Sequence, residues 1–233
     1  MQTPSHASEV LSAISAEVQA RFASFEDLAH GWEHVQRVYY LAAYIAEQEH
    51  ADLFVVSLAA LLHDLGRTIR TPASPHAERS ALLADELLAP YQLSQETQQA
   101  ILHAILAHSY RKGVAPTTLE ARVLYDADRL DSLGASGILR WGMSKGRRHA
   151  PQSKTYHPDD PFATQRSPDE KHYVLDEFFS KFLTLDEAMT TRTGRVLAQR
   201  RITFLRLYLQ ELQRELEEGN RGKASLEWWL TAS

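Results

Sequence analysis

Apolar residues recur along most of this chain at spacings of three and four, which places them on one face of an α-helix. Strict alternation of apolar and polar residues, the pattern of half-buried strands, is nearly absent. We therefore predict an all-α fold. The predicted helices cover about residues 8–23, 27–50, 53–67, 75–90 and 94–110, a stretch opened by a capping-box pattern at 117–120, and residues 172–185 and 194–218.

The most apolar of these helices is predicted to be the centre of the fold. Leu53 to Leu62 carry no charge, so this helix is expected to be buried nearly all round. Its last turn holds His63 and Asp64, and Gly66 suits a left-handed helix cap. A buried carboxylate costs several kcal/mol unless it is paired or bound to a cation. The pair is therefore either a set of metal ligands or a His and Asp satisfied at a helix end.

Further imidazole and carboxylate groups fall on inward faces of other predicted helices. His34 shares an apolar stripe with Val38 and Leu41, and His30 lies one turn earlier on the same face. A lone His on such a stripe is more often a core residue than a ligand. His30 is interpreted as a second-layer or substrate-contacting group.

Three aspartates occur within six positions of the helix that follows the capping box. Asp128 and Asp131 are spaced i and i+3 and share the inward face, whereas Asp126 is rotated well away from them. Two inward carboxylates require a cation or arginine partners. We expect Asp126 to be exposed.

Two histidines in the middle of the chain are also predicted to point inward. His76 lies in the first turn of its helix, for which Ser74 is the expected N-cap and Pro75 the first residue. His108 lies on the apolar face of the next helix, and His103 lies on the opposite side and is expected to be exposed. A hydrogen-bonded core histidine is the alternative for His108.

The segment from 140 to 168 has several prolines and little periodicity, so it is predicted to be a long polar loop. Lys145, Arg147 and Arg148 cluster there. They are interpreted either as cations on a lid over a substrate phosphate or as solvated charges. The seam of apolar residues along 202–216 is expected to pack on the core, with a homodimer interface as the minor alternative.

Composition narrows the classes of function. A chain of 233 residues with 44% hydrophobic content can form one compact domain. The absence of cysteine leaves His and carboxylates as the only strong metal ligands. A formal charge of −5 argues against a nucleic-acid partner, while a phosphate-bearing small molecule stays compatible. The chain has no long apolar run and no N-terminal signal pattern, so no membrane association and a cytoplasmic location are expected.

The inward groups occur in the order His34, His63-Asp64, Asp128, which resembles the HD-domain superfamily of metal-dependent phosphohydrolases. The similarity extends over nearly the whole chain and is closest to a small bacterial branch that acts on nucleotides. The similar segments are HGWEHVQRV, LAALLHDLGR, HAERSALLADELL, AILAHSY, LYDADRLDSLGASGI, WGMSKGR and KHYVLDEFFSKFLTLDEAMTTRTG.

This resemblance implies a single helical domain over 1–233, with the HD core at 24–133 and a loop and C-terminal helices at 134–233 packing on it. It implies a divalent cation, with manganese favoured over magnesium, iron or zinc. The implied metal ligands are His34, His63, Asp64 and Asp128. His76 and His108 occupy places where relatives with two metals have further ligands, so they are expected to bind a second metal or the substrate.

The implied activity is hydrolysis of a nucleotide by a metal-activated water, either as a pyrophosphohydrolase or as a phosphatase. Arg67 stands where some relatives have an acidic general base, so it is expected to contact phosphate, and Asp131 is expected to orient water or brace a ligand. Alternatives are a dinuclear iron oxygenase and a non-catalytic nucleotide sensor. The expected catalytic residues are Asp64, Asp131 and Arg67, and the expected substrate contacts are His30, His76, His108, Lys145, Arg147 and Arg148.

Overall fold

The computed structural model describes residues 4–69, 74–109, 114–148 and 152–231. The all-α prediction is confirmed, because these residues form helices and turns with only an isolated bridge between Lys154 and Tyr173. The α-helices are α1 (Pro4–Phe22), α2 (Trp32–Glu49), α3 (Leu53–Leu62), α4 (His76–Leu88), α5 (Gln95–Ala107), α6 (Leu119–Leu130), α7 (Gly134–Arg148), α8 (Glu177–Ser180) and α9 (Arg192–Thr231). None of the described helices is long and apolar enough to cross a membrane.

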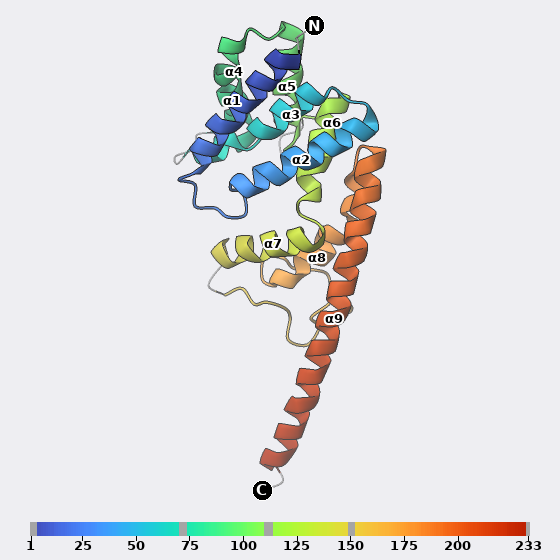
Figure 1. Cartoon of the computed structure of the whole chain (residues 1–233). Helices are drawn as coiled ribbons and strands as arrows, with labels where there is room; N and C mark the ends of the chain where they lie inside the picture. Colours follow the sequence, from blue (N-terminus) through green and yellow to red (C-terminus); the bar gives the residue numbers. More distant parts are fainter. Residues whose placement is uncertain (1–3, 70–73, 110–113, 149–151, 232–233) are drawn as a thin grey trace.

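Helix α3 lies at the centre of a bundle formed by the first six helices (Figure 1). Every residue from Val55 to Leu62 is buried, as the uncharged stretch predicted. Asp52 caps the helix by accepting hydrogen bonds from the backbone N–H groups of Phe54 and Val55. Helices α1, α2, α5 and α6 all pack against α3, so its C-terminal end is enclosed by the bundle.

The turn after α3 differs from the prediction. The α-helix ends at Leu62, and Leu65–Thr68 form a separate 3₁₀ helix. Gly66 does not adopt the expected left-handed cap, since Gly134 is the one described glycine with a positive φ. Gly66 instead permits close packing: its N–H donates to Ser80 Oγ at 2.9 Å, and a Cβ there would lie 2.5 Å from the carbonyl oxygen of His76.

Replacing Gly66 by alanine is expected to lower the free energy of unfolding by about 2 kcal/mol, because the backbone of α4 would have to move away. Gly142, in the exposed middle of α7, has nothing within 4 Å of a built Cβ. Gly142→Ala should therefore raise stability by about 0.5 to 1 kcal/mol. Chemical denaturation of both variants measures the two effects, and equal effects at the two sites would contradict the packing role of Gly66.

Several predicted boundaries shift by a few residues. Helix α2 begins at Trp32, so His30 lies in the preceding turn and not on the helix face that was expected. Pro75, not Ser74, occupies the cap position of α4. The caps of α5 and α6 are Ser94 and Thr118, whose side chains accept hydrogen bonds from the backbone N–H groups of Thr97 and Ala121, three residues further on.

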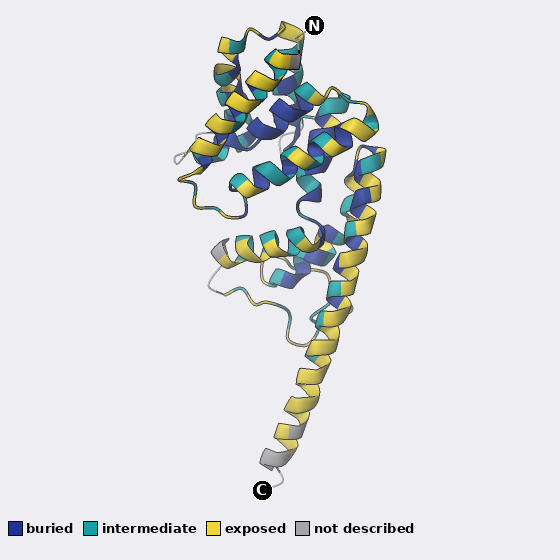
Figure 2. Cartoon of the chain, in the orientation of Figure 1, coloured by how far each residue is buried: buried dark blue, intermediate teal, exposed yellow. Residues whose placement is uncertain are grey.

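The C-terminal region differs most from the prediction. Residues 140–148 belong to α7 and are not part of a loop. The predicted helix at 172–185 is three short pieces, with a 3₁₀ turn at Val174–Asp176, then α8, then a 3₁₀ helix at Phe182–Ala188. The last helix, α9, is longer than predicted. It runs beside the bundle and beside α7 and α8, and its C-terminal part projects as an exposed rod (Figures 1 and 2).

Asp126 is fully buried, which corrects the expectation that it is exposed. Its carboxylate accepts hydrogen bonds from the backbone N–H and the hydroxyl group of both Thr190 and Thr191, just before α9. Asp126 does face away from the inward side of α6, as its helical phase indicated. The start of α9 covers that other side, so the carboxylate joins two elements instead of meeting solvent.

Candidate metal centre

The structure brings His34, His63 and Asp128 together from three helices. His34 Nε2 lies 3.4 Å from His63 Nε2 and 3.4 Å from Asp128 Oδ1. Asp64 Oδ2 lies 3.6 Å from His34 Nε2 and 3.8 Å from His63 Nε2. Three of these four side chains are fully or almost fully buried, and the Asp128 side chain is 24% exposed. The carboxylate and imidazole groups therefore face one another in a mostly dry space.

The other ring nitrogen of each histidine is fixed by a hydrogen-bond acceptor. His63 Nδ1 donates to the carbonyl oxygen of Ala60 at 2.7 Å, and His34 Nδ1 donates to Asp131 Oδ2 at 2.7 Å. Since a carbonyl oxygen only accepts, the Nδ1 of His63 carries a hydrogen, and its Nε2 is left as the atom that faces the cluster. This arrangement orients imidazole Nε2 atoms as metal ligands usually are oriented.

A second cluster shares Asp64. Its other oxygen, Oδ1, lies 3.5 Å from His76 Nε2 and 3.7 Å from His108 Nε2, and the two imidazole nitrogens are 3.1 Å apart. His108 Nδ1 is held by the carbonyl oxygen of Ile105 at 2.5 Å. Asp64 Oδ1 is buried and has no hydrogen-bond partner. A buried carboxylate oxygen without a donor, facing imidazole nitrogens, is a set of ligand atoms that suits a cation.

Charges around the centre fix its protonation. Burial alone would raise the pKa of Asp64, but Arg67, whose Nε lies 2.6 Å from Oδ2, and His63 hold that pKa well below its usual range. Burial lowers the pKa of His63 to about 4 and that of His76 to about 3. The three carboxylates around His34 outweigh its burial and the nearby Arg140, and they raise its pKa to about 9.

Asp131 lies behind the centre. It is 2% exposed, and its carboxylate accepts from His34 Nδ1 and from Arg37, whose Nε and Nη2 lie 2.7 and 3.0 Å from its two oxygens. Both oxygens are therefore engaged, and the side chain fits the bracing alternative better than the orientation of a water molecule.

Of the two other histidines considered in the sequence, one lies beside the centre and one lies away from it. His30 lies beside His34, with ring centroids 5.9 Å apart, and its Nδ1 contacts Asp27 Oδ2 at 3.2 Å. His103 is half-buried, not exposed as expected, and it accepts from Thr117 away from both clusters.

Lys145 is on α7 and pairs with Glu177 at 2.9 Å, so the expected cation-bearing loop is a helix here. The side chains of Arg147 and Arg148 lie outside the described residues.

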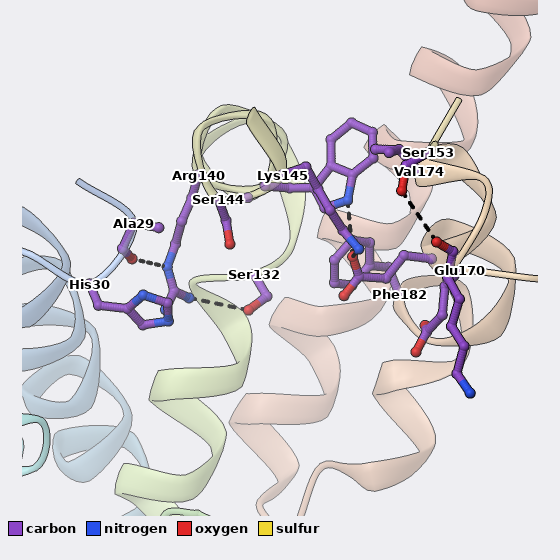
Figure 3. A pocket seen from close by; sticks show the side chains of 14 residues that line it. Ala29, His30, Ser132, Arg140, Ser144, Lys145, Ser153, Glu170, Val174 and Phe182 are labelled. Atoms are coloured by element: carbon purple, nitrogen blue, oxygen red, sulfur yellow. Dashed lines mark hydrogen bonds and ion pairs between the residues drawn. The ribbon is translucent and has the colours of Figure 1, made fainter. Parts of the chain in front are cut away.

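A cavity of about 450 Å³, beside His30, was not predicted (Figure 3). Its walls come from the turn before α2, from α7 and from the 153–182 segment, and they include Arg140, Trp141 and Glu177. A second cavity of about 400 Å³ is lined by Arg67 and Arg21, among other residues. Recognising α7 as a helix would have pointed to the first cavity, since Gly137, Arg140, Trp141 and Ser144 then share one face.

Comparison with known proteins places the fold and the cluster in a family. The HD domain family model matches residues 31–133. The uncharacterized protein YpgQ of Bacillus subtilis is 33% identical over 195 residues, which cover 82% of this chain and 86% of YpgQ. The chain therefore belongs to the HD-domain superfamily, as its motifs predicted.

Solved structures agree with this assignment. The crystal structure of Bacillus subtilis YpgQ in complex with ADP is similar with a TM-score of 0.71 and 31% identity, covering 90% of this chain and 96% of that one. An HD-superfamily hydrolase from Bacillus thuringiensis gives a TM-score of 0.70 at 25% identity, covering 91% and 98% of the two chains. The protein thus has the fold of the HD-superfamily hydrolases.

Proposed function

We propose that this protein is a divalent-metal-dependent phosphohydrolase that acts on a nucleotide. The observation that carries the proposal is Asp64: its Oδ1 is buried without a hydrogen-bond donor and faces the imidazoles of His76 and His108, while its Oδ2 faces those of His34 and His63. Such an arrangement is expensive in a protein without a cation and favourable around one. The family to which the chain belongs supports a hydrolase.

The residues present fit a divalent ion. His34, His63, Asp64 and Asp128 would hold one ion, and Asp64, His76 and His108 form a second group with ligand atoms close together. A mixed set of imidazole and carboxylate ligands suits manganese, iron or zinc, and manganese is our first choice because of the family. When bound, the ion supplies a Lewis acid for a phosphoryl oxygen and lowers the pKa of water.

The protein's own side chains prepare the site for an anionic substrate. Arg67 neutralises Asp64 and also lines the second cavity, so it can meet a phosphate group that approaches through that cavity. Asp131 and the carbonyl oxygens of Ala60 and Ile105 hold three imidazoles in fixed orientations. A rigid, pre-oriented site loses little free energy to reorganisation when the substrate binds. The ADP complex of the relative YpgQ supports a nucleotide as that substrate.

The test is a panel of nucleoside mono-, di- and triphosphates with Mn²⁺, Mg²⁺, Fe²⁺ or Zn²⁺, assayed separately for orthophosphate and pyrophosphate. We expect release of one of the two products with at least one nucleotide, and loss of that activity with a chelator. Oxygen consumption with bound iron, without phosphate release, would instead favour the dinuclear oxygenase. Nucleotide binding without turnover under any metal would favour a sensor.

A further inference from the structure

We infer that the cavity between α7 and the turn before α2 binds the nucleotide itself, with Arg140 on a phosphate group and Trp141 against the base. The inference rests on the proposed function for its choice of ligand. The cavity volume of about 450 Å³ lies within the range of small-molecule sites, roughly 300 to 1,000 Å³. It begins one side chain away from the candidate metal centre, because Arg140 Nη2 is 3.5 Å from His34 Nε2.

Arg140 is a cation whose charge is incompletely paired. Its side chain is 11% exposed, and it donates to the carbonyl oxygen of Ala29 and to Ser132 Oγ, which are both neutral (Figure 3). The carboxylate nearest to it among the described residues is Asp131, 3.7 Å from Nε, which already accepts from two other side chains.

The remaining nitrogen of Arg140, Nη2, faces the metal centre. Nη2 contacts His34 Nε2, the nitrogen through which His34 would bind a metal ion. An ion bound to His34 would leave Nη2 without an acceptor, directed toward the centre at the end of the cavity. A phosphate oxygen provides the acceptor and the charge that this guanidinium lacks. Arg140 is thereby placed to hold a substrate phosphate beside the ion.

Trp141 is held in place from two sides. Its indole N–H donates to Glu177 Oε2 at 3.1 Å, and its ring meets Phe178 edge-on with centroids 4.8 Å apart. Lys145 pairs with the same Glu177 oxygen at 2.9 Å, so two side chains of α7 are joined to α8 at this wall of the cavity. A fixed aromatic ring on a cavity wall gives a base a surface to pack against at little entropic cost.

The experiment compares two ligands that differ in the nucleoside. Binding of α,β-methylene-ADP and of methylenebisphosphonate, which share a bridge resistant to hydrolysis, is measured by calorimetry on the Mn²⁺-loaded protein. Arg140→Gln should weaken both ligands about tenfold to a hundredfold, because a charged hydrogen bond is lost. Trp141→Ala should weaken the nucleotide about tenfold and leave the bisphosphonate within about twofold.

Arg206→Gln is the matched control. Arg206 is an exposed arginine on α9 that does not line the cavity, so both affinities should stay within about twofold of wild type at saturating Mn²⁺. Arg140→Lys and Trp141→Phe, which keep the charge and the ring, should show smaller losses. These two conservative variants still test the inference if Arg140→Gln and Trp141→Ala fold poorly.

Three outcomes would overturn the inference: unchanged binding in Arg140→Gln, equal losses of both ligands in Trp141→Ala, or no binding of either ligand to the wild type. Failure of the proposed function looks different, because binding is measured without turnover. A protein that hydrolyses no nucleotide but shows the expected pattern of affinities keeps the inference and loses the proposed activity. A protein that hydrolyses nucleotides regardless of Arg140 and Trp141 does the reverse.

Discussion

Asp64→Asn is expected to lower turnover roughly 10³-fold or more, because this carboxylate reaches both clusters and the bound ion should supply several kcal/mol of transition-state stabilisation. The same variant should lose most of its affinity for Mn²⁺, measured by calorimetry on metal-free protein. Its fold should survive, since an amide has nearly the shape of a carboxylate and can donate to the facing imidazoles. Circular dichroism checks that the variant is folded.

The control for this prediction is His103→Ala. His103 is a histidine on α5, five residues before His108, yet its contacts are with Thr117. Turnover and Mn²⁺ affinity should stay at wild-type values. Full activity in Asp64→Asn, or an inactive His103→Ala, would contradict the assignment of the centre to the two clusters.

Local sequence patterns predicted that His34, His63, Asp64 and Asp128 point inward, and the structure places their side chains close together. The stripe of α2 that contains His34 and the i, i+3 spacing of Asp128 and Asp131 on α6 fix which sides of these helices face inward. Helix α3 has no outward side, so the side chains at its end are inside whatever its phase. Their convergence follows once α2, α3 and α6 pack on one another. The helical phase did not predict the different roles of Asp128 and Asp131. Asp128 faces the Nε2 atoms of the cluster, whereas Asp131 accepts a hydrogen bond from Nδ1 on the other edge of the His34 ring.

The cavity could not be predicted, because it depends on contacts between segments far apart in sequence. Arg140 bonds to Ala29, and Trp141 bonds to Glu177. The glycines and the charged residues of α7 make its sequence look like a loop. The helix packs against α9, a segment far away in the sequence, and local patterns do not report such a contact. Likewise, the pattern at 172–185 is helical, but Asp176 is drawn into bonds with Arg166 and with the N–H of Asp169, and Lys181 interrupts the helix with φ −140° and ψ −58°.

Asp126→Ala is expected to lower the free energy of unfolding by about 3 to 5 kcal/mol, which for a chain of this size is a fall in Tm of roughly 10 °C. The carboxylate accepts from two backbone N–H groups and two hydroxyl groups, at 2.6 to 3.0 Å, and is completely buried. Alanine would leave these donors without partners and without access to water.

The residues around Asp126 are packed too closely to move into the space that alanine would leave, so the loss of stability should be large. A Cβ on Gly194 would lie 2.2 Å from Asp126 Oδ2, so the start of α9 already packs directly on the carboxylate. Asp126→Asn keeps one acceptor but turns its amide N–H₂ toward a donor, so it should lose less than alanine does. Asp159→Ala, at an exposed aspartate, should change stability by at most about 0.5 kcal/mol. Thermal and urea unfolding compare the three variants; wild-type stability in Asp126→Ala would mean that α9 is held to α6 by its apolar contacts alone.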